Sequence, residues 1–151
     1  MKRIIALLLA VMTVFALTAC GGKTTTVDAQ SLAKALAEKT AFESELSAVS
    51  KEELGYYFQL PAKCDAAAYM SSGSTAEEIF VIECYDGASA AALRTSMQDF
   101  LDSQKTEMER YLPAEVDRIN GAIFETYGTC GVLCVTSDTD TARSVIKEYV
   151  K

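Results

Sequence analysis

Apolar residues recur every three or four positions in three parts of the chain, a pattern typical of helices that bury one face. The first part follows Asp28, a residue that suits a helix N-cap. The second is a long helix over residues 88–112, which Asp86 can cap, and the third follows Ser137 or Asp138. The apolar positions are Ala29, Leu32, Ala33, Leu36 and Ala37, then Ala90, Leu93, Met97, Phe100, Leu101, Met108, Tyr111 and Leu112, then Ala142, Val145, Ile146, Tyr149 and Val150.

Two shorter helices are also predicted. Residues 50–53, Ser-Lys-Glu-Glu, have the pattern of a capping box and favour a helix that continues into Tyr56-Tyr57-Phe58 and ends at Pro61. Pro113 suits the first turn of another short helix.

Four segments have the composition of strands. Residues 62–70 alternate as an edge-like strand, whereas residues 77–85 contain an apolar run on both faces and predict a central strand. Residues 121–127 and 132–136 flank Gly128-Thr129-Cys130-Gly131, which indicates a hairpin. The order of elements predicts an α+β fold with two layers: a roughly four-stranded antiparallel or mixed sheet, with helices packed mainly on one face.

The N-terminus has the three parts of a secretory signal. Lys2 and Arg3 precede an apolar stretch over residues 4–16, and Leu17-Thr18-Ala19-Cys20 follows. This tetrapeptide resembles the lipobox of bacterial lipoproteins. The resemblance implies cleavage between Ala19 and Cys20, and a diacylglycerol with acyl chains such as palmitate on the Cys20 thiol. An uncleaved membrane anchor, or a conventional signal with a chance cysteine, is the alternative.

These features divide the chain into a signal peptide at 1–19, a lipidated N-terminus and short linker at 20–27, and a single domain at 28–151. Cleavage of the signal peptide would remove Lys2 and Arg3. The remaining chain would have 12 Lys and Arg residues against 21 Asp and Glu residues, a side-chain charge of −9. Such an acidic chain is a poor ligand for nucleic acid or anionic lipid. The domain would therefore depend on its acyl chains to stay on the membrane.

The composition excludes several chemistries. The chain contains no His and no Trp. Ser-His and Cys-His nucleophilic pairs and histidine zinc sites are therefore impossible. No catalytic residue, metal site or cofactor is predicted.

Four cysteines remain after Cys20, namely Cys64, Cys84, Cys130 and Cys134. Outside the cytoplasm they can form disulfides, or they can be buried free thiols. A bridge between Cys64 and Cys84 is the easiest, because they lie on consecutive strands. Cys130 and Cys134 would be about 13 Å apart on one extended strand, beyond the reach of a disulfide.

Two other clusters have both a structural and a functional interpretation. Glu77 and Glu78 can be the solvated start of a strand or an acidic pair that binds a cation, and the solvated start is favoured. The run Tyr56-Tyr57-Phe58 cannot be buried entirely from one short helix. Core packing is favoured for it, but one of these rings can line a groove.

Three stretches occur in a recognisable order behind the Leu17–Cys20 motif: residues 72–81, Tyr111–Glu115 at the end of the long helix, and 121–138 with the final helix at 142–146. Together they resemble a family of uncharacterised bacterial lipoproteins with a domain of unknown function. The resemblance covers most of residues 45–150 and implies an extracytoplasmic, lipid-anchored protein. It carries over no catalytic residue, and the four domain cysteines are not part of the family pattern.

The function expected is binding of an envelope protein, a peptide or a small solute at the outer face of the cell membrane. The alternative is a small envelope enzyme or redox protein that uses Cys64, Cys84, Cys130 or Cys134. Capture of a substrate for a transporter is less favoured, because the domain is small for a two-lobed receptor.

Overall fold

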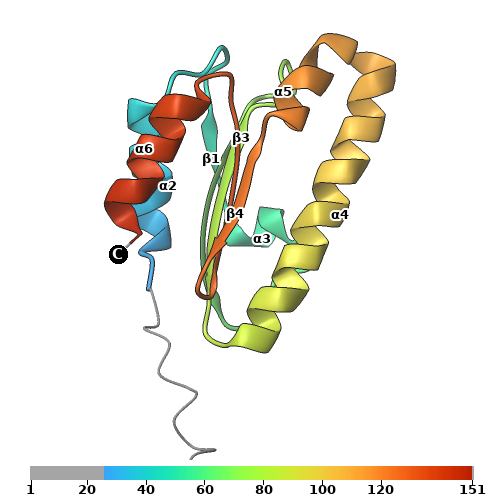
Figure 1. Ribbon diagram of the computed structural model, residues 1–151. Helices are drawn as coiled ribbons and strands as arrows, with labels where there is room; N and C mark the ends of the chain where they lie inside the picture. Colours follow the sequence, from blue (N-terminus) through green and yellow to red (C-terminus); the bar gives the residue numbers. More distant parts are fainter. Residues whose placement is uncertain (1–25, 151) are drawn as a thin grey trace, which may run out of the picture.

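The computed structural model describes residues 26–150 (Figure 1). The helices are α2 (Ala29–Lys39), α3 (Lys51–Leu54), α4 (Gly87–Tyr111), α5 (Val116–Asn120) and α6 (Thr139–Tyr149), with a 3-10 turn η2 (Pro113–Glu115) before α5. The strands are β1 (Ser47–Val49), β2 (Cys64–Met70), β3 (Glu78–Cys84), β4 (Ile123–Tyr127) and β5 (Cys130–Val135).

The strands form one antiparallel sheet in the order β1-β2-β3-β5-β4. The expected α+β class and the antiparallel sheet are confirmed, and β3 is central as predicted. The sheet has five strands because β1 pairs with the end of β2, from Ala68 to Met70. β2 is therefore not an edge strand over this part. β1 has only three residues, too few to show an alternating pattern.

Helices lie on both faces of the sheet rather than mainly on one. α2 and α6 cover one face, and α4 crosses the other (Figure 1). The cause is the composition of β3, in which Ile79 and Val81 belong to the α2/α6 core while Phe80 and Ile82 belong to the α4 core. Successive strand residues point to opposite faces, so an uninterrupted apolar run needs cover on both sides.

The predicted helix caps are confirmed. Asp28, Asp86 and Asp138 each accept from a backbone N–H three residues later, at 2.9, 2.8 and 3.4 Å respectively. Ser50 and Glu53 form both bonds of a capping box. α3 nevertheless ends at Leu54, before the aromatic run rather than after it.

Strands β4 and β5 form the predicted hairpin, in which Tyr127 pairs with Cys130. Gly128 has a φ of 60°, a conformation that suits glycine at the first position of a two-residue hairpin turn. β5 therefore begins at Cys130, two residues earlier than expected.

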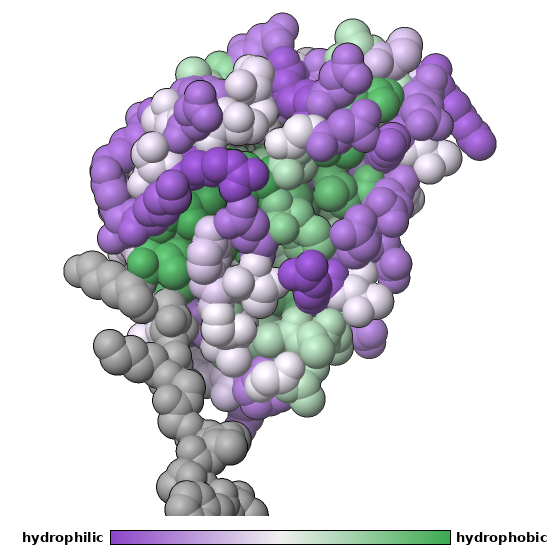
Figure 2. Space-filling model, in the orientation of Figure 1, coloured by the Kyte–Doolittle hydropathy of each residue, from purple (hydrophilic) through white to green (hydrophobic). Residues whose placement is uncertain are grey.

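The outer edge of β4 is flanked by arginines from the helices on either side. Arg94 of α4 donates to Thr126 at 2.9 Å and lies over the Phe124 ring, 5.3 Å from its centroid, and Arg143 of α6 pairs with Glu125. Figure 2 shows hydrophobic residues in the middle of this face, with hydrophilic residues around them. Charged side chains of this kind protect an edge strand from pairing with another chain.

The two ends of β3 have different neighbours. At the Cys84 end, the N–H of Val27 donates to the Glu83 carboxylate at 3.1 Å. At the Glu78 end, residues 71–77 connect β2 to β3. Among the residues that the model describes, no helix is both long enough and apolar enough to cross a membrane.

Candidate ligand site

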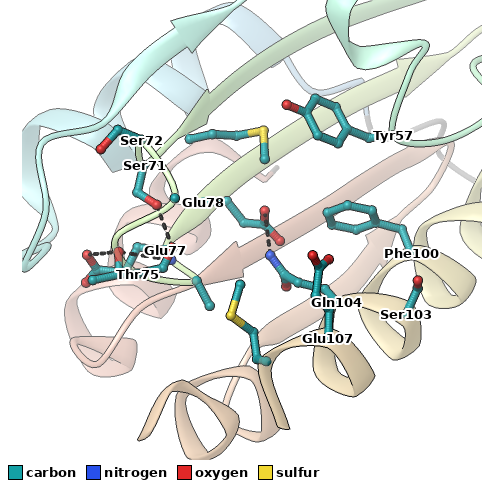
Figure 3. A pocket seen from close by; sticks show the side chains of 14 residues that line it. Tyr57, Ser71, Ser72, Thr75, Glu77, Glu78, Phe100, Ser103, Gln104 and Glu107 are labelled. Carbon is teal, nitrogen blue, oxygen red and sulfur yellow. Dashed lines mark hydrogen bonds between the residues drawn. The ribbon is translucent and has the colours of Figure 1, made fainter. Parts of the chain in front are cut away.

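A cavity of about 510 Å³ opens between the β2–β3 connection and the C-terminal half of α4 (Figure 3). β2 and β3 supply its floor, α4 supplies one wall, and the segment after α3 supplies an aromatic ring. The lining residues are Tyr57, Met70, Ser71, Ser72, Gly73, Thr75, Ala76, Glu77, Glu78, Phe100, Ser103, Gln104, Glu107 and Met108.

Glu78 lies at the floor of this cavity and is only 1% exposed. As the first residue of β3 it lies on the same face as Phe80 and Ile82, the face that α4 covers. Gln104 of α4 donates from Nε2 to Glu78 Oε2 at 3.1 Å. The second carboxyl oxygen, Oε1, has no hydrogen-bond partner, and neither does Oε1 of Gln104. Each residue of this pair therefore has one buried side-chain oxygen without a hydrogen-bond partner.

Burial raises the pKa of the Glu78 carboxyl to about 8, although the hydrogen bond from Gln104 acts in the opposite direction. At neutral pH the acid is therefore mainly protonated. A protonated carboxyl has one O–H donor, and the carbonyl oxygen of Gln104 is an acceptor that lacks one. Protonation removes the charge of Glu78, and burial of an ionised carboxylate without a counter-charge is expensive.

Part of the remaining wall is apolar. Tyr57 and Phe100 meet edge to face with centroids 6.0 Å apart, and the thioethers of Met70 and Met108 line the same space (Figure 3). Aromatic rings and thioethers accommodate apolar ligand groups of varied shape. The site therefore combines an apolar body with one buried hydrogen-bonding acid, an arrangement common in small-molecule sites.

Glu77 has a different role, although it is the next residue. Its carboxylate accepts from the backbone N–H groups of Glu43 and Ser44 at 2.9 and 2.8 Å and from the Thr75 hydroxyl at 3.1 Å. Arg118 Nε lies 3.9 Å away. Glu77 thus fastens the loop after α2 to the start of β3. The favoured interpretation of Glu77 and Glu78 as a solvated strand start is wrong, because both are 1% exposed.

The aromatic run is divided between three environments. Phe58 packs in the core edge to face against Phe80, with centroids 5.3 Å apart. Tyr57 lines the cavity, in agreement with the alternative that one of these rings lines a groove. Tyr56 is 87% exposed.

Gln104 is not singled out by sequence reasoning, but a signal for it exists. The apolar stripe of α4 passes from Leu101 to Met108, and Gln104 occupies the missing position three or four residues from each. A polar residue on the buried stripe of an amphipathic helix needs a polar partner opposite it, and here that partner is Glu78.

All four cysteines of the described chain are buried free thiols. Cys64 and Cys84 are paired directly across β2 and β3, on the α4 face. Cys130 and Cys134 lie on β5 and belong to the other core. Burial raises the pKa of Cys84 to about 11, and the pKa values of Cys130 and Cys134 to about 12. Within residues 26–150, no group of three or more acidic or cysteine side chains is placed to hold a metal ion.

The predicted cleavage and lipidation residues, Ala19 and Cys20, lie outside the described residues. The structure therefore adds nothing to the leader, the lipobox or the linker before Thr26.

The fold and cavity define a small α+β domain whose cavity is lined by two buried acids, Glu77 and Glu78, and by apolar and polar side chains. The chain belongs to a family described as a domain of unknown function, DUF4358, whose model matches residues 38–136. The matched segment includes all five strands and both Glu78 and Gln104. A search of curated proteins and a search of solved structures each gave no match.

Proposed function

We propose that this chain is a lipid-anchored binding protein at the outer face of the cell membrane, and that its ligand enters the Glu78 cavity. The observation that carries the binding role is the buried Glu78 carboxyl, which belongs to the lining of a cavity of about 510 Å³ and has one oxygen without a hydrogen-bond partner. A buried polar atom without a hydrogen-bond partner costs stability, and a bound ligand can supply that partner. The ligand is a small solute or a side chain of an envelope protein or peptide.

The membrane location rests on the N-terminal sequence alone. Lys2 and Arg3, the apolar stretch and Leu17–Cys20 together fit a lipoprotein leader. Two acyl chains on Cys20 would anchor the domain stably, since each buried CH₂ contributes about 0.8 kcal/mol.

The alternative of a thiol-based envelope enzyme finds less support. A reactive cysteine is a partly exposed thiolate with a lowered pKa. Cys84, Cys130 and Cys134 are buried, and their pKa values are raised. Cys64 is buried as well.

The anchor is tested by growing bacterial cells that express the chain with an alkyne analogue of palmitate. The expected result is label on the wild-type protein in the membrane fraction, and none on Cys20→Ala. A matched control, Cys134→Ala, should be labelled like the wild type. Label that persists in Cys20→Ala would contradict the anchor.

The cavity is tested with three aromatic probes of similar size: benzyl alcohol, benzylammonium and benzoate. We expect at least one of them to shift the amide resonances of the lining residues of the full chain in detergent. Ser103→Trp fills the cavity from the exposed side of α4 and should abolish these shifts. Thr95→Trp, on an exposed part of α4 outside the cavity, should leave them intact. Absence of a shift at the cavity with all three probes would contradict the proposed binding role.

A further inference from the structure

The charges around the cavity all have one sign. Its ionisable acids are Glu77, Glu78 and Glu107, and no Lys or Arg is among the described residues that line it. Glu77 accepts hydrogen bonds from the loop after α2. Glu78 is the acid that has an oxygen without a hydrogen-bond partner. An anionic ligand would find no lysine or arginine partner among the described lining residues.

The walls also favour a positive charge. Tyr57 and Phe100 line the same cavity as Glu78 (Figure 3). A ring face attracts a cation within about 6 Å of its centroid. Met70 and Met108 add polarizable sulfur and room for an apolar ligand body.

We propose that the ligand is a primary ammonium ion on an apolar body, and that its N–H groups bind the Glu78 carboxylate. This inference rests on the proposed function of the cavity. The ammonium replaces Gln104 Nε2 as donor to Oε2 and supplies the partner that Oε1 lacks. Gln104 is partly exposed as a residue, and its amide has to turn outward to make room for the ammonium group.

The binding step has a defined proton balance. The free acid carries a proton at neutral pH, and the bound form is a carboxylate paired with a cation. The Glu78 proton therefore passes to solvent while the ammonium keeps its own three. With a pKa of about 8 for the free acid, roughly nine-tenths of a proton is released per complex at pH 7.

The other titratable groups around Glu78 are Glu77, Glu107 and Tyr57, which share the cavity, and Cys134, which lies nearby on β5. The Cys134 thiol has a pKa of about 12, so it keeps its proton at pH 7.

The test is calorimetry of the full chain in detergent at pH 7, with buffers of different ionisation enthalpy. Benzylammonium should bind at least about tenfold more tightly than benzyl alcohol, and benzoate should show no binding. The buffer dependence should report close to one proton released. Glu78→Gln should lose at least about tenfold in benzylammonium affinity, together with the proton release. Glu109→Gln, an equal charge change on an exposed part of α4, should bind like the wild type.

Equal affinity for benzyl alcohol and benzylammonium would overturn the ammonium inference while leaving the cavity as a ligand site. Binding of benzylammonium by the wild type without proton release would overturn it too, and this readout needs no variant to fold. Absence of binding by all three probes would instead overturn the proposed function. An N-acetyl-lysine methylamide probe separates the two sources of the ammonium group. If this probe binds more tightly than benzylammonium, the ligand is a lysine side chain of a peptide. If it binds more weakly, the ligand is a free amine.

Discussion

The carboxyl groups of Glu77 and Glu78 leave the chain in opposite directions, although the two residues are consecutive (Figure 3). Glu77 accepts two backbone N–H bonds from the loop after α2. Glu78 accepts one bond from Gln104 and has an oxygen to spare. Glu77 thus has several hydrogen-bond partners within the fold, whereas Glu78 has one oxygen without a partner.

Glu78 should make the protein less stable as the pH rises. Its pKa is about 8 in the folded chain against an ordinary value of 4.5, so the folded state holds a proton that the unfolded state has lost. The stabilisation is complete below pH 4.5 and declines as the pH rises to about 8. It amounts to roughly 5 kcal/mol over the whole interval. Urea unfolding between pH 5 and pH 8.5 measures this decline.

Glu78→Gln is the control, because it removes the titrating group and keeps its shape. Its free energy of unfolding should change much less over that pH range. The capping carboxyls Asp28, Asp86 and Asp138 have lowered pKa values, so their effects appear at acid pH, outside the range. Equal pH dependence of wild type and Glu78→Gln would show that Glu78 is not a buried neutral acid.

Loss of Glu77 should loosen the loop after α2. Glu77→Ala leaves the N–H groups of Glu43 and Ser44 without their acceptor and should cost about 3 kcal/mol. The same change should speed hydrogen exchange at these two amides. Glu107→Ala, at an exposed position of α4, is the matched control and should have little effect. Unchanged exchange at Glu43 and Ser44 in Glu77→Ala would refute this role.

Cys64 and Cys84 should form a disulfide when the protein is exposed to glutathione disulfide. The N–H of Cys84 donates to Thr129 on the β5 side at 3.1 Å, so Cys64 and Cys84 face each other as a non-hydrogen-bonded pair. Such pairs have Cα atoms about 4.5 Å apart, within the range for a disulfide. Closing this loop should stabilise the fold by about 3 kcal/mol.

Mass spectrometry of a digest without reductant checks the pairing. Two thiols should disappear and those of Cys130 and Cys134 should remain. Cys64→Ala should prevent the bridge, and Cys134→Ala should not. A bridge that includes Cys130 or Cys134 would refute the prediction.

Gly131 is where α4 approaches the sheet most closely among the glycines described. A Cβ there would lie 3.2 Å from Met97 Sδ and 3.4 Å from Leu93 Cδ2. Gly131→Val should therefore destabilise the protein by about 1–3 kcal/mol through overpacking. Gly87→Ala meets no atom within 4 Å and is the control. Thermal unfolding of both variants measures the difference, and equal midpoints would contradict this close contact.

The sequence predicted helices best where the helical pattern of apolar residues extended over many turns. The stripe from Ala90 to Met108 predicts α4, and the Asp28 and Asp86 caps define two helix starts to within a residue. β1 was not predicted, because its three residues form a strand only by pairing with β2, which is distant in sequence. The apolar run of β3 implied that both faces of the sheet are covered. Which helix covers which face depends on tertiary packing.

The candidate site was harder to predict because it depends on one tertiary contact. Two glutamates before an apolar run usually mark a solvated strand end, and only the length of α4 brings Gln104 over Glu78. The local sequence contains the alternation that turns Glu78 toward α4, but not the helix that buries it. The pKa shift follows from that burial and is therefore invisible in the sequence.

The hydrogen bond from Val27 to Glu83 places the start of the described chain at the Cys84 end of β3. Glu83 and Glu78 are at opposite ends of β3, about 17 Å apart at the rise of an extended strand. If Cys20 holds the lipid, the tether enters the domain at the Glu83 end, and the cavity opens at the end remote from the bilayer. Such a domain would sample the surrounding medium rather than extract molecules from the lipid phase.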